Sequence, residues 1–159
     1  SCRVLHTGDD YLEFELVYPA CCSAGKMTYH ITLKRGERFF RNDVSFEKPF
    51  ARGFRAGPGI DLEAKRDHHG SLVEDGARGL VSLFEDPKGE NGRDGSTMEA
   101  IFVARGSDCE MMTDNLNCRV LAFKTNAFTY WAGASWSGAG EITDARTWHE
   151  CVKAFQDGL

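Results

Sequence analysis

The sequence predicts a mainly β protein, an antiparallel β-sandwich with one C-terminal α-helix. Most segments alternate apolar and polar residues with a period of two, turn residues separate them at short intervals, and only one segment has helical periodicity. Many short antiparallel strands are typical of a sandwich. Because 42% of the 159 residues are hydrophobic, we expect a single β-sandwich domain over residues 1–159.

The strands are predicted from this alternation. Residues 11–18, YLEFELVY, place four apolar side chains on one face and two glutamates on the other. Residues 27–35, MTYHITLKR, alternate in the same way, and Gly36 predicts a turn before a strand within residues 38–48. Further strands are expected within residues 51–61 (bent by Gly and Pro), 79–85, 98–105, 118–125 and 127–133.

One helix is predicted, over residues 144–158, DARTWHECVKAFQDG. Asp144 can cap its start and Gly158 suits its end. Its apolar stripe consists of Trp148, Cys151, Val152 and Phe155. We expect the helix to seal one edge of the sandwich, with Trp148 in the core and Cys151 in a disulfide.

The charge distribution is uneven. The net charge of −5 and the pI near 5.5 argue against general nucleic-acid binding. Residues 26–56 nevertheless carry a local charge of +5, which leaves −10 on the remainder. This basic strand region could bind an anionic polymer, or its charges could simply belong to solvated strand faces.

Six cysteines suggest disulfides. They are Cys2, Cys21, Cys22, Cys109, Cys118 and Cys151. The even count, without a CxxC pair or a His at zinc spacing, favours disulfides over a metal site. Cys109 and Cys118 flank a turn-prone run and are expected to pair across a hairpin or loop. The neighbours Cys21 and Cys22 are expected to take separate partners, with Cys2 and Cys151 as the candidates.

The same features predict a secreted, extracellular protein. The chain starts at Ser1 and contains no apolar run of about 18 residues, so we expect a mature secreted protein without a membrane span. No metal or other cofactor is expected. The adjacent histidines of residues 67–70, DHHG, point to opposite faces of an extended chain. The acidic loop over residues 85–96 lacks the spacing of an EF-hand.

A closing motif resembles a known family. Residues 128–155, FTYWAGASWSGAGEITDARTWHECVKAF, contain an aromatic-Tyr-aromatic run, Ala-Gly-Ala, a Trp, a Gly turn and a Trp-bearing helix. The matching positions are Phe128, Tyr130, Trp131, Ala132, Gly133, Ala134, Trp136, Gly140 and Trp148. Upstream, ITLKRGERFFRNDVSFE, FRAGPGI and MEAIFV occur in the family's order.

The resemblance is to the C-terminal half of a secreted bacterial domain of unknown function, a large β-sandwich. Members of this family often occur with enzymes that degrade pectin and other uronic-acid polysaccharides. The resemblance therefore implies an acidic polysaccharide or another glycan as the partner.

Candidate site residues follow from this chemistry. A lyase acting on uronic acids needs a group that neutralises the carboxylate, a base for the C5 proton and an acid for the leaving oxygen. Arg38, Arg41 and Asn42 could supply the first role, His30 the second and Tyr130 the third. For each of these residues, ordinary core or surface packing is the competing interpretation.

The tryptophans also have two interpretations. Trp131 and Trp136 could stack on sugar rings or fill a core beside the glycines, whereas Trp148 on the apolar stripe is expected in the core.

Two functions are therefore expected. The first is a secreted β-sandwich that binds carbohydrate, builds an extracellular assembly, or both, with another copy or a complementary chain covering open sheet edges. Residues 11–18 and 98–105 would be poorly protected if they lay at such an edge. The alternative is a lyase or hydrolase acting on uronic-acid glycans. An enzyme predicts a cleft where His30, Arg41 and an aromatic side chain converge, whereas a pure assembly protein predicts buried edges and no such cleft.

Overall fold

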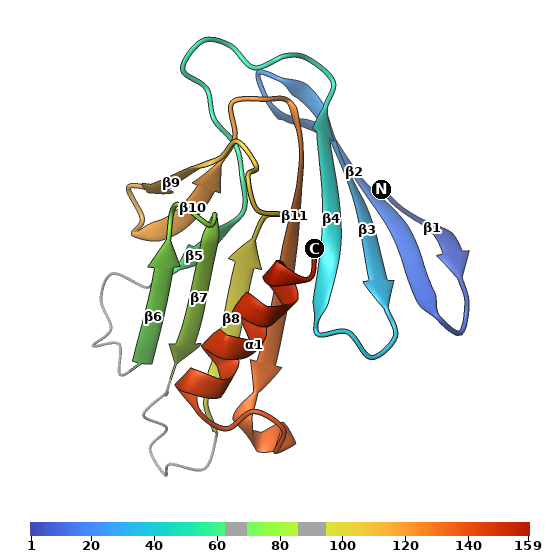
Figure 1. The fold of residues 1–159 in the computed structure, drawn as a ribbon. Helices are drawn as coiled ribbons and strands as arrows, with labels where there is room; N and C mark the ends of the chain where they lie inside the picture. Colours follow the sequence, from blue (N-terminus) through green and yellow to red (C-terminus); the bar gives the residue numbers. More distant parts are fainter. Residues whose placement is uncertain (63–69, 86–94) are drawn as a thin grey trace.

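The computed structural model describes residues 1–62, 70–85 and 95–159, apart from the side chain of Cys21, and is mainly β with one C-terminal helix (Figure 1). The larger antiparallel sheet has the order β1 (Cys2–Thr7), β2 (Tyr11–Cys22), β3 (Gly25–Lys34), β4 (Phe39–Phe46), β11 (Ala127–Trp136), β8 (Thr97–Phe102), β7 (Leu80–Glu85) and β6 (Gly70–Asp75). The smaller sheet has the order β5 (Gly59–Asp61), β10 (Cys118–Ala122) and β9 (Glu110–Thr113). A 3-10 turn (Ser137–Ala139) and α1 (Ala145–Asp157) follow β11.

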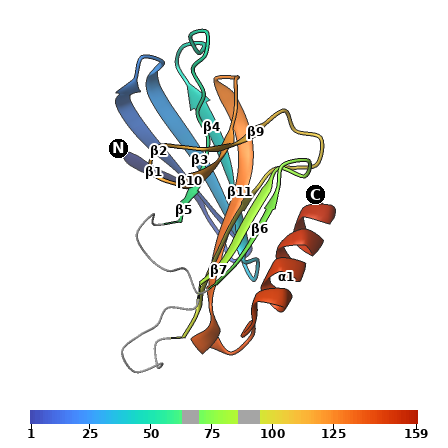
Figure 2. The same cartoon turned by 90° about the vertical axis from the view of Figure 1, so that its left-hand side faces the viewer.

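The larger sheet is covered on both faces at its β6–β8 end. On one face, Trp148 and Val152 of α1 pack in a cluster with Phe39, Leu80 and Phe102. On the other face, the smaller sheet contributes a second apolar cluster with residues of β7 and β8, so the helix and the smaller sheet lie on opposite sides (Figure 2). These two clusters make up most of the core and fix the position of α1.

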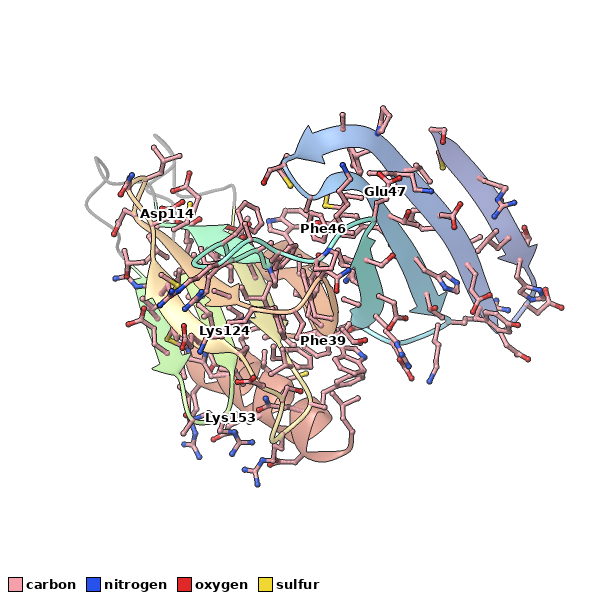
Figure 3. All side chains as sticks on the ribbon, turned by 90° about the horizontal axis from the view of Figure 1, so that it is seen from above. Phe39, Phe46, Glu47, Asp114, Lys124 and Lys153 are labelled. Atoms are coloured by element: carbon pink, nitrogen blue, oxygen red, sulfur yellow. The ribbon has the colours of Figure 1, made fainter. Side chains whose placement is uncertain are left out.

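The remainder of the larger sheet extends beyond these covers. Strands β1, β2 and β3 lie to one side of the helix (Figure 1). Alternation divides their side chains between two faces, which we name the helix-side face and the small-sheet face. Figure 3 shows the division on β4, where Phe39 lies toward the helix and Phe46 lies on the other side. The helix-side face of β2–β4 is consequently polar and open.

The predicted strands and helix are confirmed, within a few residues at their ends. Gly36 has a φ of 79°, the left-handed conformation that a turn between β3 and β4 requires. Asp144 caps α1, because its side chain accepts a hydrogen bond from the Thr147 amide. Of the range 51–61, only β5 is a strand, and Ala56 adds an isolated bridge to Phe123.

Three strands were not predicted. β1, β6 and β9 are short, and each lies at the edge of its sheet. All six residues of β1 are exposed, so its sequence has no buried face to produce an apolar period. β1 makes β2 an interior strand, and β8 is interior as well, so neither residues 11–18 nor residues 98–105 lie at a sheet edge.

The predicted disulfides are also wrong, since the structure shows none among the residues it describes. β9 and β10 do form a hairpin, but its register pairs Arg119 with Thr113 and Ala122 with Glu110. Cys118 and Cys109 therefore lie at opposite ends of the hairpin, beyond the reach of one disulfide. Cys2 lies on β1, and Cys151 packs with the cluster under α1. The side chain of Cys21 lies outside the described residues.

The described part of the chain contains no helix long and apolar enough to cross a membrane.

Candidate functional site

A cleft of about 800 Å³ lies between the C-terminal end of α1 and the helix-side face of the larger sheet. Its lining residues are Glu13, His30, Thr32, Lys34, Glu37, Arg41, Asp43, Ala104, Trp131, Phe155, Gly158 and Leu159. A concave site that combines aromatic side chains with a few polar groups is the usual form of a ligand pocket. We refer to it as the helix-side cleft.

The register of three strands assembles the floor of this cleft. Thr32 pairs with Arg41, and Arg41 pairs with Trp131, which places these three residues in one row across β3, β4 and β11. The next row on the same face contains His30, Asp43 and Thr129. Rows on one face are two residues apart, about 7 Å along the strands. Residues that are distant in the sequence thus become neighbours through strand pairing.

Arg41 is fixed by a hydrogen-bonded network with Asp43. Its Nε donates to Oδ1 and Oδ2 of Asp43 over 3.1 and 2.9 Å, and its Nη2 donates to Oδ1 over 2.8 Å. Thr129 Oγ1 donates to the same Oδ1 over 2.6 Å. Burial alone would raise the pKa of Asp43, but the hydrogen bonds from Arg41 and Thr129 outweigh it, so the pKa lies below its ordinary value. Asp43 is therefore charged at neutral pH and orients the guanidinium.

Trp131 forms an apolar wall of the cleft. Its ring stacks against Phe102 with the centroids 6.4 Å apart and the planes 6° apart. The Arg41 Cζ atom lies 5.8 Å from the centroid of the Trp131 ring, within the range of a cation–π contact. Trp131 thus packs on the core cluster under α1 and also lines the cleft, so both interpretations of this residue hold.

Charged side chains of both signs complete the cleft. Lys34 Nζ lies 3.6 Å from Glu37 Oε1, and His30 Nε2 lies 3.8 Å from Glu13 Oε2. The His30–Glu13 contact is an ion pair only when the imidazole is protonated. Among the described residues, His30 Nε2 has no hydrogen-bond partner. The cleft therefore presents donors and acceptors in near balance rather than one excess charge.

Of the residues proposed for lyase chemistry, His30 and Arg41 meet in the cleft and Tyr130 does not. Tyr130 precedes Trp131 on β11, so its side chain lies on the small-sheet face, packed with the second apolar cluster. Burial, followed by the charge and hydrogen bond of Tyr29, raises its pKa. Asn42 lies on the same face as Tyr130 and donates to the Phe40 carbonyl over 3.3 Å.

Arg38 and Trp136 also lie outside the helix-side cleft. Arg38 forms an ion pair with Glu141. Trp136, at the end of β11, is half exposed and lies beside Gly138. Trp131 and Trp136 are five residues apart on one extended strand, about 17 Å, so they cannot stack on the same sugar ring.

The basic region of residues 26–56 does not form one positive surface. Four of its basic side chains are paired with carboxylates: Lys34 with Glu37, Arg38 with Glu141, Arg41 with Asp43 and Arg55 with Glu110.

Metal binding finds no support in the described part of the chain, where no group of three or more His, Cys, Asp or Glu side chains is placed to hold an ion. The histidines of DHHG lie outside the described residues, as does most of the acidic loop, residues 86–94.

Sequence reasoning missed Asp43, Thr129 and Glu13. A signal for Asp43 was present, because residues i and i+2 of a strand share a face and Arg41 and Asp43 have opposite charge. Thr129 stands in the same relation to Trp131. Glu13 could not be found in this way, because its place opposite Thr32, and so within reach of His30, depends on the β2–β3 register.

Comparison with known proteins identifies a family for this chain. The family model of the domain of unknown function DUF4861 matches residues 1–159, so the chain belongs to that family. No curated protein and no solved structure matches the chain.

Proposed function

We propose that this DUF4861 domain binds a glycan in the helix-side cleft. The observation that carries the proposal is the convergence of Trp131, Arg41 and His30 on one open, concave face. An aromatic wall beside oriented polar groups suits a sugar ring, because such a ring offers apolar C–H faces and a rim of hydroxyls. The facing sheets also support our expectation of a β-sandwich.

The polar groups of the cleft match a polyhydroxylated ligand. An arginine carries five N–H donors, and Arg41 uses two of them on Asp43, which leaves three for a ligand. Glu13 and Glu37 supply acceptors, and Lys34 supplies further donors. Because Asp43 already holds Arg41 in place, less conformational entropy is lost when a ligand binds.

An acidic polysaccharide is the first ligand to test. Lys34 and Arg41 can each face a uronic carboxylate, and the closing motif resembles proteins that accompany pectin degradation. An extracellular location follows as part of the same proposal, since polysaccharides of this kind lie outside cells. The absence of disulfides among the described residues removes the cysteine argument for secretion.

Isothermal titration with galacturonic acid oligomers and neutral xylo-oligomers tests the proposal. Trp131→Ala should weaken binding of the better ligand at least tenfold, because it removes the apolar wall. Trp136→Ala is the matched control, since this exposed tryptophan of the same strand lies outside the cleft, and it should bind like the parent. Circular dichroism should show both variants folded. Equal affinity of the parent and Trp131→Ala, or no binding by the parent, would overturn the proposal.

A lyase is the second candidate, and it is favoured by the position of His30 beside Arg41 in the same cleft. In β-elimination a base removes the C5 proton, the electron pair forms the C4–C5 double bond, the C4–O bond breaks and the leaving oxygen takes up a proton from water. His30 is the candidate base, and Lys34 or Arg41 would neutralise the carboxylate. Tyr130 cannot be the acid, because it lies on the opposite face of the sheet.

The absorbance of the unsaturated product distinguishes a lyase from a binding protein. If the domain is a lyase, His30→Ala should abolish product formation from polygalacturonate and Tyr130→Phe should retain it. No product from the parent protein would leave binding as the function.

Self-association or a complementary chain belongs to the same proposal. β1 is an edge strand that pairs on one side with β2. All six of its residues are exposed, and the apolar Val4 is 59% exposed to solvent. Such an edge is a template for pairing with another strand.

A further inference from the structure

The helix-side cleft does not end at the row that contains Trp131. The helix-side face continues along the same three strands to a third row, which contains Thr28, Ser45 and Ala127. From the Trp131 row to this third row the strands advance about 13 Å, a distance that exceeds one sugar ring.

Two further hollows adjoin the cleft. One, of about 490 Å³, shares His30 and Asp43 with the cleft and adds Thr28 and Ser45. The other, of about 460 Å³, shares Arg41 and Trp131 with the cleft and adds Ser107 and Thr125. Both hollows also contain Thr129. Because the first hollow shares lining residues with the cleft, the two form one furrow across β3, β4 and β11, and the second hollow borders this furrow between β11 and residues 104–108.

The chemistry changes along the furrow. The Trp131 row offers an aromatic wall and charged groups, whereas the third row offers only two hydroxyls and a methyl group. Ser45 and Ala127 are exposed, and their small side chains leave the end of the furrow open toward the β4 and β11 ends. A site for one free sugar would be closed at this point, whereas an open end allows a chain to continue.

We propose that the ligand is a linear oligosaccharide or polysaccharide, with one sugar unit against Trp131 and the following units over His30, Asp43 and the Thr28–Ser45–Ala127 row. This inference rests on the proposed function and specifies its ligand as a chain rather than a single sugar. It also places His30 and Asp43 in the middle row, opposite a linkage between units. A reaction at this site would then cleave within a chain.

Titration with ligands of increasing length tests this inference. Galacturonic acid, its oligomers of two to six units and the matching xylose series are titrated into the parent protein by calorimetry. We expect affinity for the better series to rise at least tenfold from one unit to three or four units and then to level off. No binding of any length would overturn the proposed function and this inference together. Binding that is equally tight for one unit and for six units would overturn this inference alone.

A substitution in the third row provides a second, independent measurement. Ser45→Tyr should fill the end of the furrow, and an aromatic side chain suits an exposed strand position. We expect this variant to bind the single sugar with the affinity of the parent. It should lose most of the increase in affinity that longer oligomers show with the parent. Thr97→Tyr makes a similar change at an exposed strand position outside the three hollows, and it should keep the full gain. A full gain with length in Ser45→Tyr would contradict the placement of the second unit.

Discussion

Trp131 and Tyr130 show how one residue step decides the role of a side chain in this protein. Both are aromatic and adjacent on β11, yet Trp131 lines the helix-side cleft and Tyr130 packs beneath the smaller sheet. Neighbouring side chains of a strand point to opposite faces, so Tyr130 and Trp131 cannot line the same cleft. This much could be predicted from the sequence. The sequence could not show that His30 and Arg41 lie near Trp131. Their proximity depends on the strand order β3-β4-β11, which joins strands far apart in the chain.

His149 forms a buried contact between α1 and the larger sheet. Its Nδ1 lies 2.8 Å from Ser82 Oγ and its Nε2 lies 3.1 Å from Ser71 Oγ. Burial lowers the pKa of His149, and the nearby charge of Lys153 lowers it further, against a smaller opposing effect of a hydrogen bond with Ser71. The folded state therefore favours the neutral imidazole.

This pKa shift predicts a loss of stability in acid. The unfolded chain takes up a proton near the ordinary pKa of about 6.5, before the folded chain does. The stability contributed by His149 is present above that pH and falls as the pH drops below it. Urea unfolding at about pH 7.5 and about pH 5.5 measures this effect. The free energy of unfolding should depend less on pH in His149→Phe than in the parent. His6→Phe, at an exposed position on β1, should keep the parent's dependence, and a His149→Phe variant with that same dependence would contradict the assignment.

At the scale of elements, the strands and α1 were predictable because each has one buried face that imposes a period on the sequence. The edge strands β1 and β9 lack such a face and were missed. The cysteines show a different limit, because pairing depends on register. Only the β9–β10 register shows that Cys109 and Cys118 lie at opposite ends of their hairpin.

The helix α1 depends chiefly on Trp148, which is fully buried with Phe39 beside it. Trp148→Ala should reduce the free energy of unfolding by about 3–5 kcal/mol, the usual cost of removing a large buried aromatic side chain. Trp148 Nε1 has no hydrogen-bond partner among the described residues, so Trp148→Phe loses only packing and should cost much less. Urea unfolding measures both changes. Arg146→Ala, at an exposed helix position, should unfold like the parent, and equal losses for the two Trp148 variants would contradict this account.

At the scale of the whole molecule, the helix and the smaller sheet cover only one end of the larger sheet. Strands β1 to β3 project beyond them and end in the exposed edge of β1 (Figure 3). The uncovered part provides both the helix-side cleft and the candidate assembly edge. The incomplete cover was not predictable from composition, because the sequence has enough apolar residues for a closed core.

Self-association through β1 is tested by size-exclusion chromatography with light scattering. We expect the parent to form a dimer or larger species. Val4→Lys should shift it toward the monomer, because a lysine at an edge opposes strand pairing. Leu116→Lys, at an exposed position in the β9–β10 turn, should leave the mass unchanged. A parent protein that is monomeric at all concentrations would contradict self-association and leave a complementary chain as the candidate partner.

Amide chemical-shift mapping is the sharpest test of whether the helix-side cleft binds a glycan chain. A galacturonic acid oligomer is titrated into isotopically labelled protein, with the xylose oligomer in parallel. We predict that the largest shifts occur at His30, Thr32, Arg41 and Thr129 and at the indole N–H of Trp131, while Trp136 and the smaller sheet change little. Shifts concentrated on the small-sheet face, or no shifts with either oligomer, would contradict the claim.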